Sequence, residues 1–133
     1  MKGKEGLIVR DAARFDIALH ARFRIGPEHQ TVVRFSQAAG VRDGWLEAEV
    51  VDLSAHGVGL VSGVFVPRRC RLELRVFGAA RDNLLFSIHC TVRRVVMTDR
   101  RPAYLLGLAF ETSDGSALRQ IRALLEQLET TAD

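Results

Sequence analysis

The sequence of 133 residues has no uninterrupted apolar run of the length that a membrane-spanning helix needs, about eighteen residues or more. Its N-terminal stretch, M-K-G-K-E-G-L-I-V-R-D, also lacks the apolar segment of a secretion signal. These two absences predict a cytoplasmic protein without a membrane span. The length is that of one domain, and a hydrophobic content of 47% is enough for a single core.

Cysteine is rare, since the chain has only Cys70 and Cys90. Both occupy inward-facing positions of predicted strands, which favours buried free thiols over a disulfide or a metal site. The four histidines show no metal-ligand spacing. The chain also lacks a GxGxxG loop, a Walker-type loop and a recognisable Ser/His/Asp arrangement. The sequence therefore predicts no metal, no cofactor and no enzymatic activity.

Lysine is almost absent, since Lys2 and Lys4 are the only lysines in the sequence. The 19 lysines and arginines outnumber the 16 acidic residues, so the excess of positive charge comes from arginine. Arginine carries a planar guanidinium group that pairs with phosphates and guanine edges. The excess is compatible with an anionic partner, and a GC-rich coding sequence would produce it equally well. Residues that stack on nucleic acid bases are scarce, with one Trp, one Tyr and seven Phe that mostly face inward.

A period of two dominates the sequence from Phe15 to Ile25, where apolar and polar residues alternate strictly. Such alternation is typical of a half-buried β-strand. Five further segments resemble strands, and they cover residues 45–53, 58–62, 70–76, 85–97 and 104–110. Within residues 85–97 the inward parity shifts by one position after the Arg93-Arg94 pair, so that Val95 and Met97 become the inward residues. A shift of one residue is what a β-bulge produces.

After residue 113 the period changes to that of a helix. Leu118, Ile121, Leu125 and Leu128 are spaced three, four and three residues apart, which makes one apolar stripe. We expect a helix over about residues 113–130 that packs on the strands or on another subunit. Six short strands and a terminal helix predict a mainly β fold, a small antiparallel barrel.

The predicted organisation has two parts. Residues 1–14 form a polar, basic arm without periodicity, and residues 15–133 form the barrel with its C-terminal helix. The connection at residues 26–44 is ambiguous, since it could add a short strand or a helical turn. It is long for a link within one domain, so we expect some local structure in it.

The stretch D-L-S-A-H-G at residues 52–57 carries more polar groups than a plain hairpin turn needs. Asp52 and Ser54 are two residues apart, so on a strand both side chains emerge from one face. Gly57 permits a positive φ or the close approach of a ligand. A turn in which Asp and Ser bond to their own backbone explains the stretch equally well.

A second motif, R-D-A-A-R, stands just before the first strand and contains Arg10 and Arg14. At this spacing two guanidinium groups are able to grip one dianionic ligand. A pair of solvated surface arginines is the simpler interpretation of this motif alone.

Together, R-x-x-x-R before the first strand and D-x-S-x-x-G between the second and third resemble the PilZ domain family of bacterial cyclic di-GMP receptors. The stretch A-R-F-D-I-A-L-H-A-R-F-R resembles the first strand of that family, and V-V-D-L-S-A-H-G-V-G-L resembles its second hairpin. Y-L-L-G-L-A-F is similar to its final strand, which a helix follows. The resemblance extends from about residue 9 to residue 128.

The resemblance implies a six-stranded PilZ-type barrel and a cyclic di-GMP site formed by Arg10, Arg14, Asp52, Ser54 and Gly57. The arginines would hold phosphate or reach guanine O6 and N7. Asp52 would accept from guanine N1–H and the exocyclic amine, and Ser54 would add a hydrogen bond. Gly57 would keep the turn tight, and the arm would become ordered over the ligand.

Two positions depart from the family pattern, and both are secondary candidates for the site. His56 stands where the family often has a small residue, and we assign it to the turn rather than to base stacking. Val9 precedes Arg10 where some members carry a further arginine, which favours one ligand per site over an intercalated ligand dimer.

The sequence thus predicts a single-domain cyclic di-GMP receptor, not an enzyme, that signals to an unidentified partner protein through the arm or the helix. One alternative is a nucleotide-blind PilZ-like adaptor for protein interactions, which the intact RxxxR and DxSxxG motifs disfavour. The other is a small-barrel nucleic-acid-binding protein, which would bind in a salt-dependent way without any response to the dinucleotide.

Overall fold

The strands and the helix follow the predicted order along the chain. The computed structural model describes residues 14–29, 44–80, 82–98, 103–113 and 115–131. Their elements are β1 Phe15–Ile25, the short 3-10 helix η1 Pro27–His29, β2 Leu46–Leu53, β3 Gly57–Ser62, β4 Arg71–Phe77, β5 Leu84–Met97, β6 Tyr104–Phe110 and α1 Gly115–Thr131. Within residues 26–44, where the sequence was ambiguous, the described part contains η1, and residues 30–43 lie outside the described residues.

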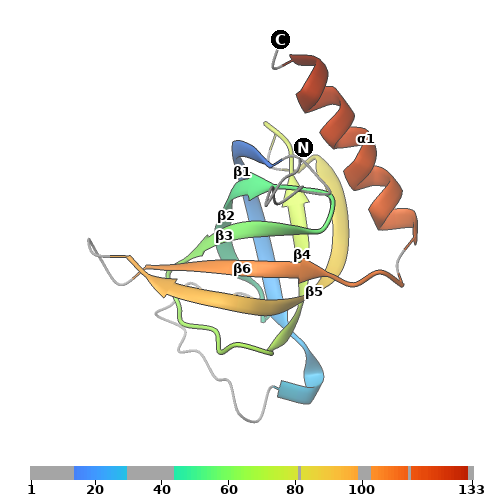
Figure 1. Cartoon of the computed structure of the whole chain (residues 1–133). Helices are drawn as coiled ribbons and strands as arrows, with labels where there is room; N and C mark the ends of the chain where they lie inside the picture. Colours follow the sequence, from blue (N-terminus) through green and yellow to red (C-terminus); the bar gives the residue numbers. More distant parts are fainter. Residues whose placement is uncertain (1–13, 30–43, 81, 99–102, 114, 132–133) are drawn as a thin grey trace, which may run out of the picture.

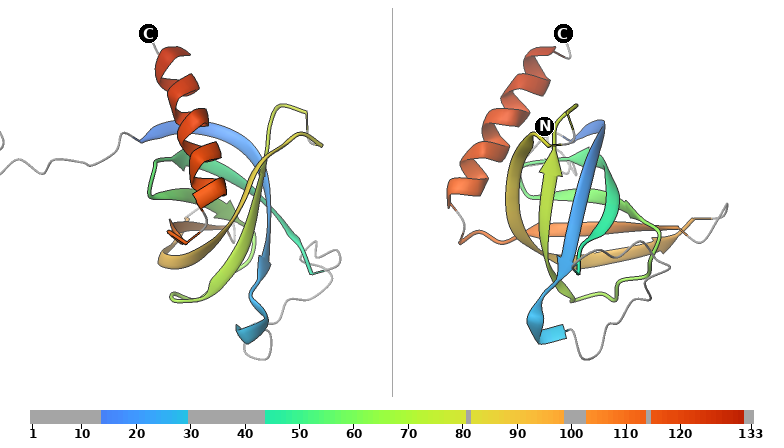
Figure 2. Two further views of the ribbon diagram at one scale, coloured as in Figure 1. Left: turned by 90° about the vertical axis from the view of Figure 1, so that its right-hand side faces the viewer. Right: turned by 180° about the vertical axis from the view of Figure 1, so that it is seen from behind.

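The six strands close into a barrel in the order β1-β2-β3-β6-β5-β4 (Figures 1 and 2). Every neighbouring pair is antiparallel, including the pairing of β1 with β4 that closes the barrel. The prediction of a mainly β fold with a six-stranded antiparallel barrel and a C-terminal helix is therefore confirmed. Closure also leaves no strand of the barrel with an unpaired edge.

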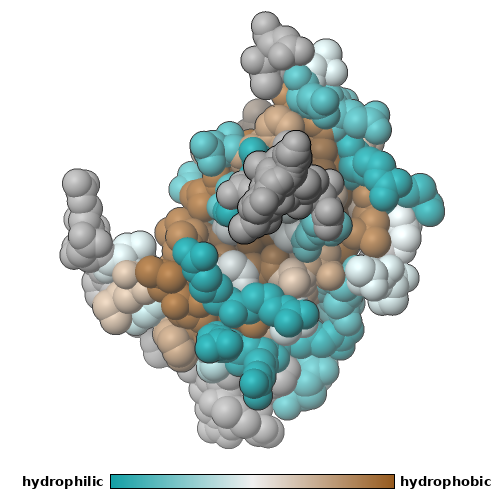
Figure 3. Space-filling view, viewed as in Figure 1, coloured by the Kyte–Doolittle hydropathy of each residue, from teal (hydrophilic) through white to brown (hydrophobic). Residues whose placement is uncertain are grey.

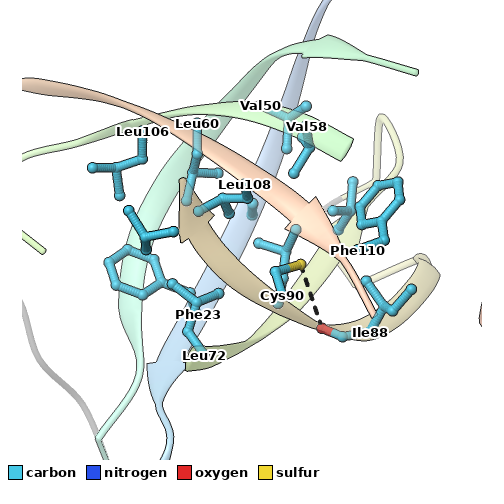
Figure 4. Packing of buried hydrophobic residues seen from close by; sticks show 14 of the residues in the cluster. Phe23, Val50, Val58, Leu60, Leu72, Ile88, Cys90, Leu106, Leu108 and Phe110 are labelled. Atoms are coloured by element: carbon cyan, nitrogen blue, oxygen red, sulfur yellow. Dashed lines mark hydrogen bonds between the residues drawn. The ribbon is translucent and has the colours of Figure 1, made fainter. Parts of the chain in front are cut away.

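The barrel interior is filled by the inward half of each alternating strand, as Figure 4 shows from close by. Phe23, Val50, Leu60 and Leu74 are fully buried. Because the period of strand side chains is two, this inward set leaves the alternate residues on the outer wall. The outer wall is therefore where polar side chains are available to a ligand.

The register shifts in four of the six strand pairings, and one of these shifts was predicted. The register of β5 against β6 shifts between Val92 and Arg94, which confirms the bulge expected at the arginine pair. A second shift lies between Val50 and Asp52 in the pairing of β2 with β3, and the sequence analysis did not predict it. Val95 then packs against the core as expected, but Met97 is 66% exposed, so its predicted inward position is wrong.

Helix α1 packs beside β5 on the outside of the barrel (Figure 2). Ala117 and Ile121 are buried, and Leu118, Leu125 and Leu128 are partly buried against the core. The apolar stripe thus covers the chain's own barrel, which decides between the two surfaces left open by the sequence. No helix among the described residues is long and apolar enough to cross a membrane.

Cys70 and Cys90 are buried free thiols, as predicted. Burial is the main cause that raises the pKa of both thiols above the ordinary value, because the thiolate loses its hydration. The negative charge of Glu28 acts on Cys70 and that of Glu111 acts on Cys90, and each adds to the effect of burial on the pKa. Both cysteines therefore act as small apolar core residues.

Candidate functional site

A cleft of about 370 Å³ lies on the outer wall of the barrel, over β3 and β6. This wall faces the viewer in Figures 1 and 3, where a pale to brown strip is bordered by hydrophilic surface over β5. The cleft is lined by Arg14, Asp52, Ser54, His56, Gly57, Val58, Gly59, Arg93, Arg94, Leu105, Leu106, Gly107, Leu108 and Ala109.

One row of residues crosses the centre of the cleft from strand to strand. Asp52 of β2 pairs with Gly59 of β3, Gly59 pairs with Gly107 of β6, and Gly107 pairs with Arg94 of β5. An acidic and a basic side chain therefore stand at the two ends, with two glycines between them. The two glycines contribute backbone and no side chain of their own to the floor of the cleft.

The glycines of this floor are required by close contacts rather than by backbone conformation. A Cβ atom on Gly59 would overlap the Asp52 carboxylate, since it would lie 2.8 Å from Asp52 Cγ. A Cβ atom on Gly107 would lie 3.3 Å from Arg94 Cβ. The absence of a side chain at Gly59 thus leaves the space over the sheet that the Asp52 carboxylate occupies.

The two bulges turn these end residues outward. In a regular strand Asp52 would point to the same side as the buried Val50, and Arg94 to the same side as the buried Val92. One extra residue on each strand, Val51 on β2 and Arg93 on β5, reverses that parity. The bulges therefore place a carboxylate and a guanidinium on the outer wall.

Arg14 binds Asp52 directly from the residue before β1. Its Nη2 lies 3.0 Å from Asp52 Oδ2, and the arginine side chain is 53% exposed whereas the aspartate is 19% exposed. The pairing of Phe15 with Leu53 brings the start of β1 next to the end of β2, which explains the contact. The other arginine of the RxxxR motif, Arg10, lies outside the described residues, as does Val9.

Ser54 is engaged in the turn that follows β2. Its hydroxyl accepts from the backbone N–H of His56 at 3.3 Å and donates to the carbonyl of Gly57 at 3.4 Å. The Ser54 N–H also donates to the Gly57 carbonyl at 3.0 Å. Turn formation, one of the two interpretations of this stretch, therefore accounts for Ser54, although the residue still lines the cleft.

Of the two reasons predicted for Gly57, a positive φ is wrong, and the close approach of a ligand stays a prediction. Its φ is not in the left-handed region, because among the described glycines only Gly44 has a positive φ. A Cβ atom on Gly57 would instead collide with the carbonyl oxygen of Leu108 on β6. Close approach of a neighbouring strand, rather than a positive φ, therefore requires glycine here.

The remaining candidates fall on one side of the cleft. His56 is exposed at the tip of the turn and lines the cleft, while its backbone carbonyl accepts from the N–H of Phe110 at 2.9 Å. The structure thus brings Arg14, Asp52, Ser54, His56 and Gly57 together on one wall. We find no group of three or more metal-ligating side chains within the described part of the chain.

Nine residues that line the cleft were not proposed as site residues by the sequence analysis, and four of them are glycine or arginine: Gly59, Arg93, Arg94 and Gly107. The parity shift at Arg93-Arg94 and the glycine of Y-L-L-G-L-A-F were both visible in the sequence. Neither feature tells which residues lie opposite each other, because the register between β3, β6 and β5 is set by the closed barrel. Strand pairing was therefore the missing information.

The cleft has an excess of positive charge. Asp52 is the only carboxylate that lines it among the described residues, and Arg14 already pairs with that group. Arg93 and Arg94 are exposed, and neither forms an ion pair with any residue that the structure describes. A basic cleft with a flat floor and one carboxylate is suited to an anionic ligand that also carries a planar group with hydrogen-bond donors.

The fold and the cleft define a small antiparallel barrel with a basic cleft on its outer wall. The chain belongs to the PilZ domain family, because the PilZ domain model matches residues 9–127. No curated protein matches the sequence.

Solved structures with the same fold are similar to this chain. The PilZ domain of YcgR from Escherichia coli with c-di-GMP is 16% identical, with a TM-score of 0.59, and the match covers 92% of this chain and 93% of that one. The K. pneumonia MrkH–c-di-GMP complex is 17% identical, with a TM-score of 0.66, over 95% of this chain and 54% of that one.

A third similar structure is the Bacillus subtilis inhibitor of motility MotI/DgrA, which is 13% identical with a TM-score of 0.62. The match covers 93% of this chain and 53% of that one, so this chain spans about half the length of MotI and of MrkH. At these identities the likeness shows a shared fold.

Proposed function

We propose that this protein is a cyclic di-GMP receptor that binds the dinucleotide between the segment carrying Arg10 and Arg14 and the outer wall of the barrel. Membership of the PilZ family supports this function, and two of the similar structures are described as complexes with c-di-GMP. The observation that carries the proposal is the row in which Asp52 and Arg94 stand at opposite ends of a floor made of two glycines.

Each part of that row suits one part of the ligand. A guanine ring is flat, so it would be able to lie along the backbone of Gly59 and Gly107 with its edge against the Asp52 carboxylate, which lies over Gly59. Asp52 would accept from N1–H and the exocyclic amine of guanine, two donors that no adenine edge offers in this arrangement. The arginines would neutralise the phosphates or reach guanine O6 and N7 as a fork.

The contact between Arg14 and Asp52 fits this assignment. A carboxylate accepts up to about four hydrogen bonds, so Asp52 is able to keep Arg14 on Oδ2 while Oδ1 accepts from guanine. Arg14 would then hold the carboxylate in a fixed position before the ligand arrives. In this proposal Arg93 and Arg94 supply positive charge on the opposite side of the cleft.

In this function the protein is a receptor rather than an enzyme. Binding would hold the segment that carries Arg10 against the barrel, and the changed surface would signal to a partner protein. The Ser54 hydroxyl, which lines the cleft, is bonded to turn backbone rather than to a base that would activate it. The site therefore supports recognition of the dinucleotide without chemistry on it.

Calorimetry with cyclic di-GMP tests the proposal on the wild type and on Arg14→Ala. We expect one ligand per site for the wild type and a loss of about 2–5 kcal/mol of binding free energy for the variant, since removing Arg14 leaves the charge of Asp52 unpaired. Cyclic di-AMP serves as the control ligand and should bind far more weakly, because adenine lacks the donors that Asp52 requires. Absence of heat with the wild type would overturn the function.

The same measurements separate the alternatives. A nucleotide-blind adaptor would give no heat with either dinucleotide. A nucleic-acid-binding barrel would bind DNA or RNA with an affinity that falls steeply as the salt concentration rises, without competition from cyclic di-GMP. Equal binding by the wild type and Arg14→Ala would place the ligand elsewhere on the barrel.

A further inference from the structure

Exposed apolar side chains gather at the end of the β5–β6 hairpin. Phe65 is 53% exposed, Val96 41% and Met97 66%, and they are three of the four large hydrophobic residues that are exposed among the described residues. In Figure 3 brown surface marks this hairpin end, at the left of the view. Single exposed apolar residues are ordinary, but a cluster on one projecting element indicates an interaction site.

Two members of this cluster, Phe65 and Met97, line a groove of about 480 Å³ that is distinct from the cleft described above. Its lining consists of Phe65, Pro67, Arg68, Val95, Met97 and Tyr104. The rings of Phe65 and Tyr104 meet edge to face with centroids 5.6 Å apart, so one wall of the groove is a fixed aromatic pair. We name this site the hairpin groove.

The hairpin end is apolar on both of its faces. Met97 pairs with Tyr104, and Val96 pairs with Leu105, so consecutive residues of each strand project to opposite faces of the hairpin. Figure 1 shows that this end of the hairpin extends past the rest of the barrel, to the left. The helix does not cover it, because α1 lies beside β5 at the other side of the barrel.

The rim of the hairpin groove is basic. Arg68 lines the groove, Arg69 follows it, and both are exposed. Neither side chain forms an ion pair with the residues that the structure describes, and no described acidic residue lines the groove. The rim therefore presents positive charge that the rest of the described surface leaves unmatched.

The backbone holds this rim in place. Arg69 has a φ of 72°, a backbone conformation that residues other than glycine rarely adopt. Its N–H donates to the Val92 carbonyl at 2.8 Å, and the Cys70 N–H donates to the Pro67 carbonyl at 3.2 Å. A rim that is already ordered loses less conformational entropy when a partner binds.

We propose that the hairpin groove docks an extended segment of a partner protein that carries apolar side chains flanked by aspartate or glutamate. The apolar side chains would enter between Met97 and the aromatic pair, and the acidic residues would face Arg68 and Arg69. A second copy of this chain fits poorly, because a two-fold contact at this site would bring the two basic rims together. A membrane surface would favour a convex apolar tip over a concave groove with aromatic walls.

The hairpin groove and the cleft lie on the same two strands. Arg94 of the cleft is followed by Val95 of the groove on β5, and Tyr104 of the groove is followed by Leu105 of the cleft on β6. A partner in the groove would therefore contact the strands that would carry the dinucleotide. The docking site itself does not depend on the proposed function, since its apolar lining and its charge are properties of the unliganded chain.

Selection from a displayed library of random peptides, each about twelve residues long, tests the proposal without a known partner. The full chain is the bait, and a synthetic peptide made from the selected consensus is then titrated by calorimetry. We expect consensus sequences with aromatic or aliphatic residues next to aspartate or glutamate. A library that yields no binder, or only basic or purely polar sequences, would overturn the proposal.

Variants locate the binding site. Met97→Asp and Arg68→Glu should each weaken the selected peptide about tenfold or more, because the first places a charge in the groove and the second reverses the rim. Leu84→Asp is the matched control, since Leu84 is 50% exposed on the same strand but outside the groove. An equal loss in Leu84→Asp, or no loss in Met97→Asp, would contradict the assignment.

Three further measurements complete the design. Circular dichroism should show that all variants remain folded, as expected for substitutions at exposed positions. Cyclic di-GMP calorimetry on Met97→Asp should match the wild type, so failure of the proposed function and failure of the groove are distinguishable. Self-association in sedimentation, or binding to phosphatidylserine vesicles, that Met97→Asp abolishes would overturn the proposal in favour of a second copy or a membrane.

Discussion

The arginines of the β1–β4 wall and those near the β5–β6 wall have opposite surroundings. On β1 and β4, Arg22 binds Glu47 and Arg24 binds Glu73, each at 2.8 Å. Arg24 and Arg75 also stack on the Trp45 ring, with guanidinium carbons 4.6 and 4.2 Å from its centroid. On the other wall Arg93 and Arg94, and likewise Arg68 and Arg69, have no ion pair among the residues that the structure describes.

Strand register explains the difference. Arg22 lies directly opposite Glu47 in the pairing of β1 with β2, and Arg24 lies opposite Glu73 in the pairing of β1 with β4. Directly opposite residues of unlike charge stabilise an antiparallel pair. Arg94 lies opposite Gly107, which offers no side chain at all. The first wall uses arginine to join strands, whereas the second leaves its arginines available to an anion.

Among the variants that compare the two walls, the largest expected effect comes from one arginine of each wall, tested in cyclic di-GMP calorimetry. We expect Arg94→Ala to lose about 2 kcal/mol of binding free energy, or roughly thirtyfold in affinity, because a charge-assisted contact to the ligand is removed. Arg24→Ala removes the same charge from the chain and should change affinity less than about twofold, while it lowers thermal stability slightly. Similar losses of affinity in both variants would show that net charge, rather than the cleft, attracts the ligand.

The floor of the cleft contains Gly59, and a single added methyl group would disturb it. In Gly59→Ala the new Cβ would displace the Asp52 carboxylate, so we expect about a tenfold loss of cyclic di-GMP affinity. Gly63→Ala is the control, because a Cβ at Gly63 meets nothing within 4 Å. Unchanged affinity in Gly59→Ala, measured by the same titration, would exclude the floor from the ligand site.

A further arginine, Arg71 at the start of β4, forms an ion pair with Glu111, which follows β6. This pair predicts that stability depends on pH through Glu111. Arg71 donates from Nη2 to Glu111 Oε2 at 2.8 Å, and chiefly through this hydrogen bond the pKa of Glu111 is lowered in the folded protein. A lowered folded pKa contributes stability above the unfolded pKa, about 4.3, and this contribution is lost as the pH falls through the folded value. Glu111→Gln should therefore have a lower Tm than the wild type at neutral pH.

The two Tm curves should converge as the medium becomes acidic, because the wild-type carboxylate is then protonated. Thermal melting followed by circular dichroism, from neutral pH into the acid range, measures this convergence. Glu129→Gln on the exposed side of α1 is the matched control and should leave the curve unchanged. A constant gap between wild type and Glu111→Gln at every pH would contradict the role given to this pair.

The smallest expected effect concerns the rim of the hairpin groove. Arg69→Gly removes the steric cost of a left-handed backbone conformation in the folded protein, and this favours folding. Glycine also adds freedom to the unfolded chain, which opposes folding but is the smaller effect here. We therefore expect a gain of about 0.5 kcal/mol in the free energy of unfolding. Urea denaturation measures the gain, and Arg68→Gly, at a neighbouring position without a positive φ, should not show it. A stabilised Arg69→Gly that also loses the selected peptide would show that this arginine serves binding rather than folding.

Much of the fold was predictable because local periodicity specifies it. The alternation from Phe15 to Ile25 gave the first strand with its observed bounds, and the parity shift at Arg93-Arg94 gave the bulge. The exposure of Met97 was not predictable, since its parity is inward but the hairpin extends beyond the barrel. The helix stripe predicted an apolar contact surface without telling which surface it would cover.

Much less of the candidate site followed from the sequence. The motifs led to Arg14, Asp52, Ser54, His56 and Gly57, which the structure places around one cleft, while Arg10 and Val9 stay predictions outside the described residues. The contact between Arg14 and Asp52 requires the ends of β1 and β2 to meet, which is a property of strand pairing. The opposite side of the cleft escaped prediction for the same reason.

The sequence by itself determined the strand and helix periods, the family motifs and the excess of arginine, because each of these is written in residue order. Only the tertiary structure decided which arginines are neutralised and which are left free for a ligand. Closure of the barrel sets Arg22 and Arg24 against carboxylates and sets Arg94 against a glycine. Electrostatic pairing acts over a few ångströms between residues distant in sequence, so it depends on strand register rather than on composition.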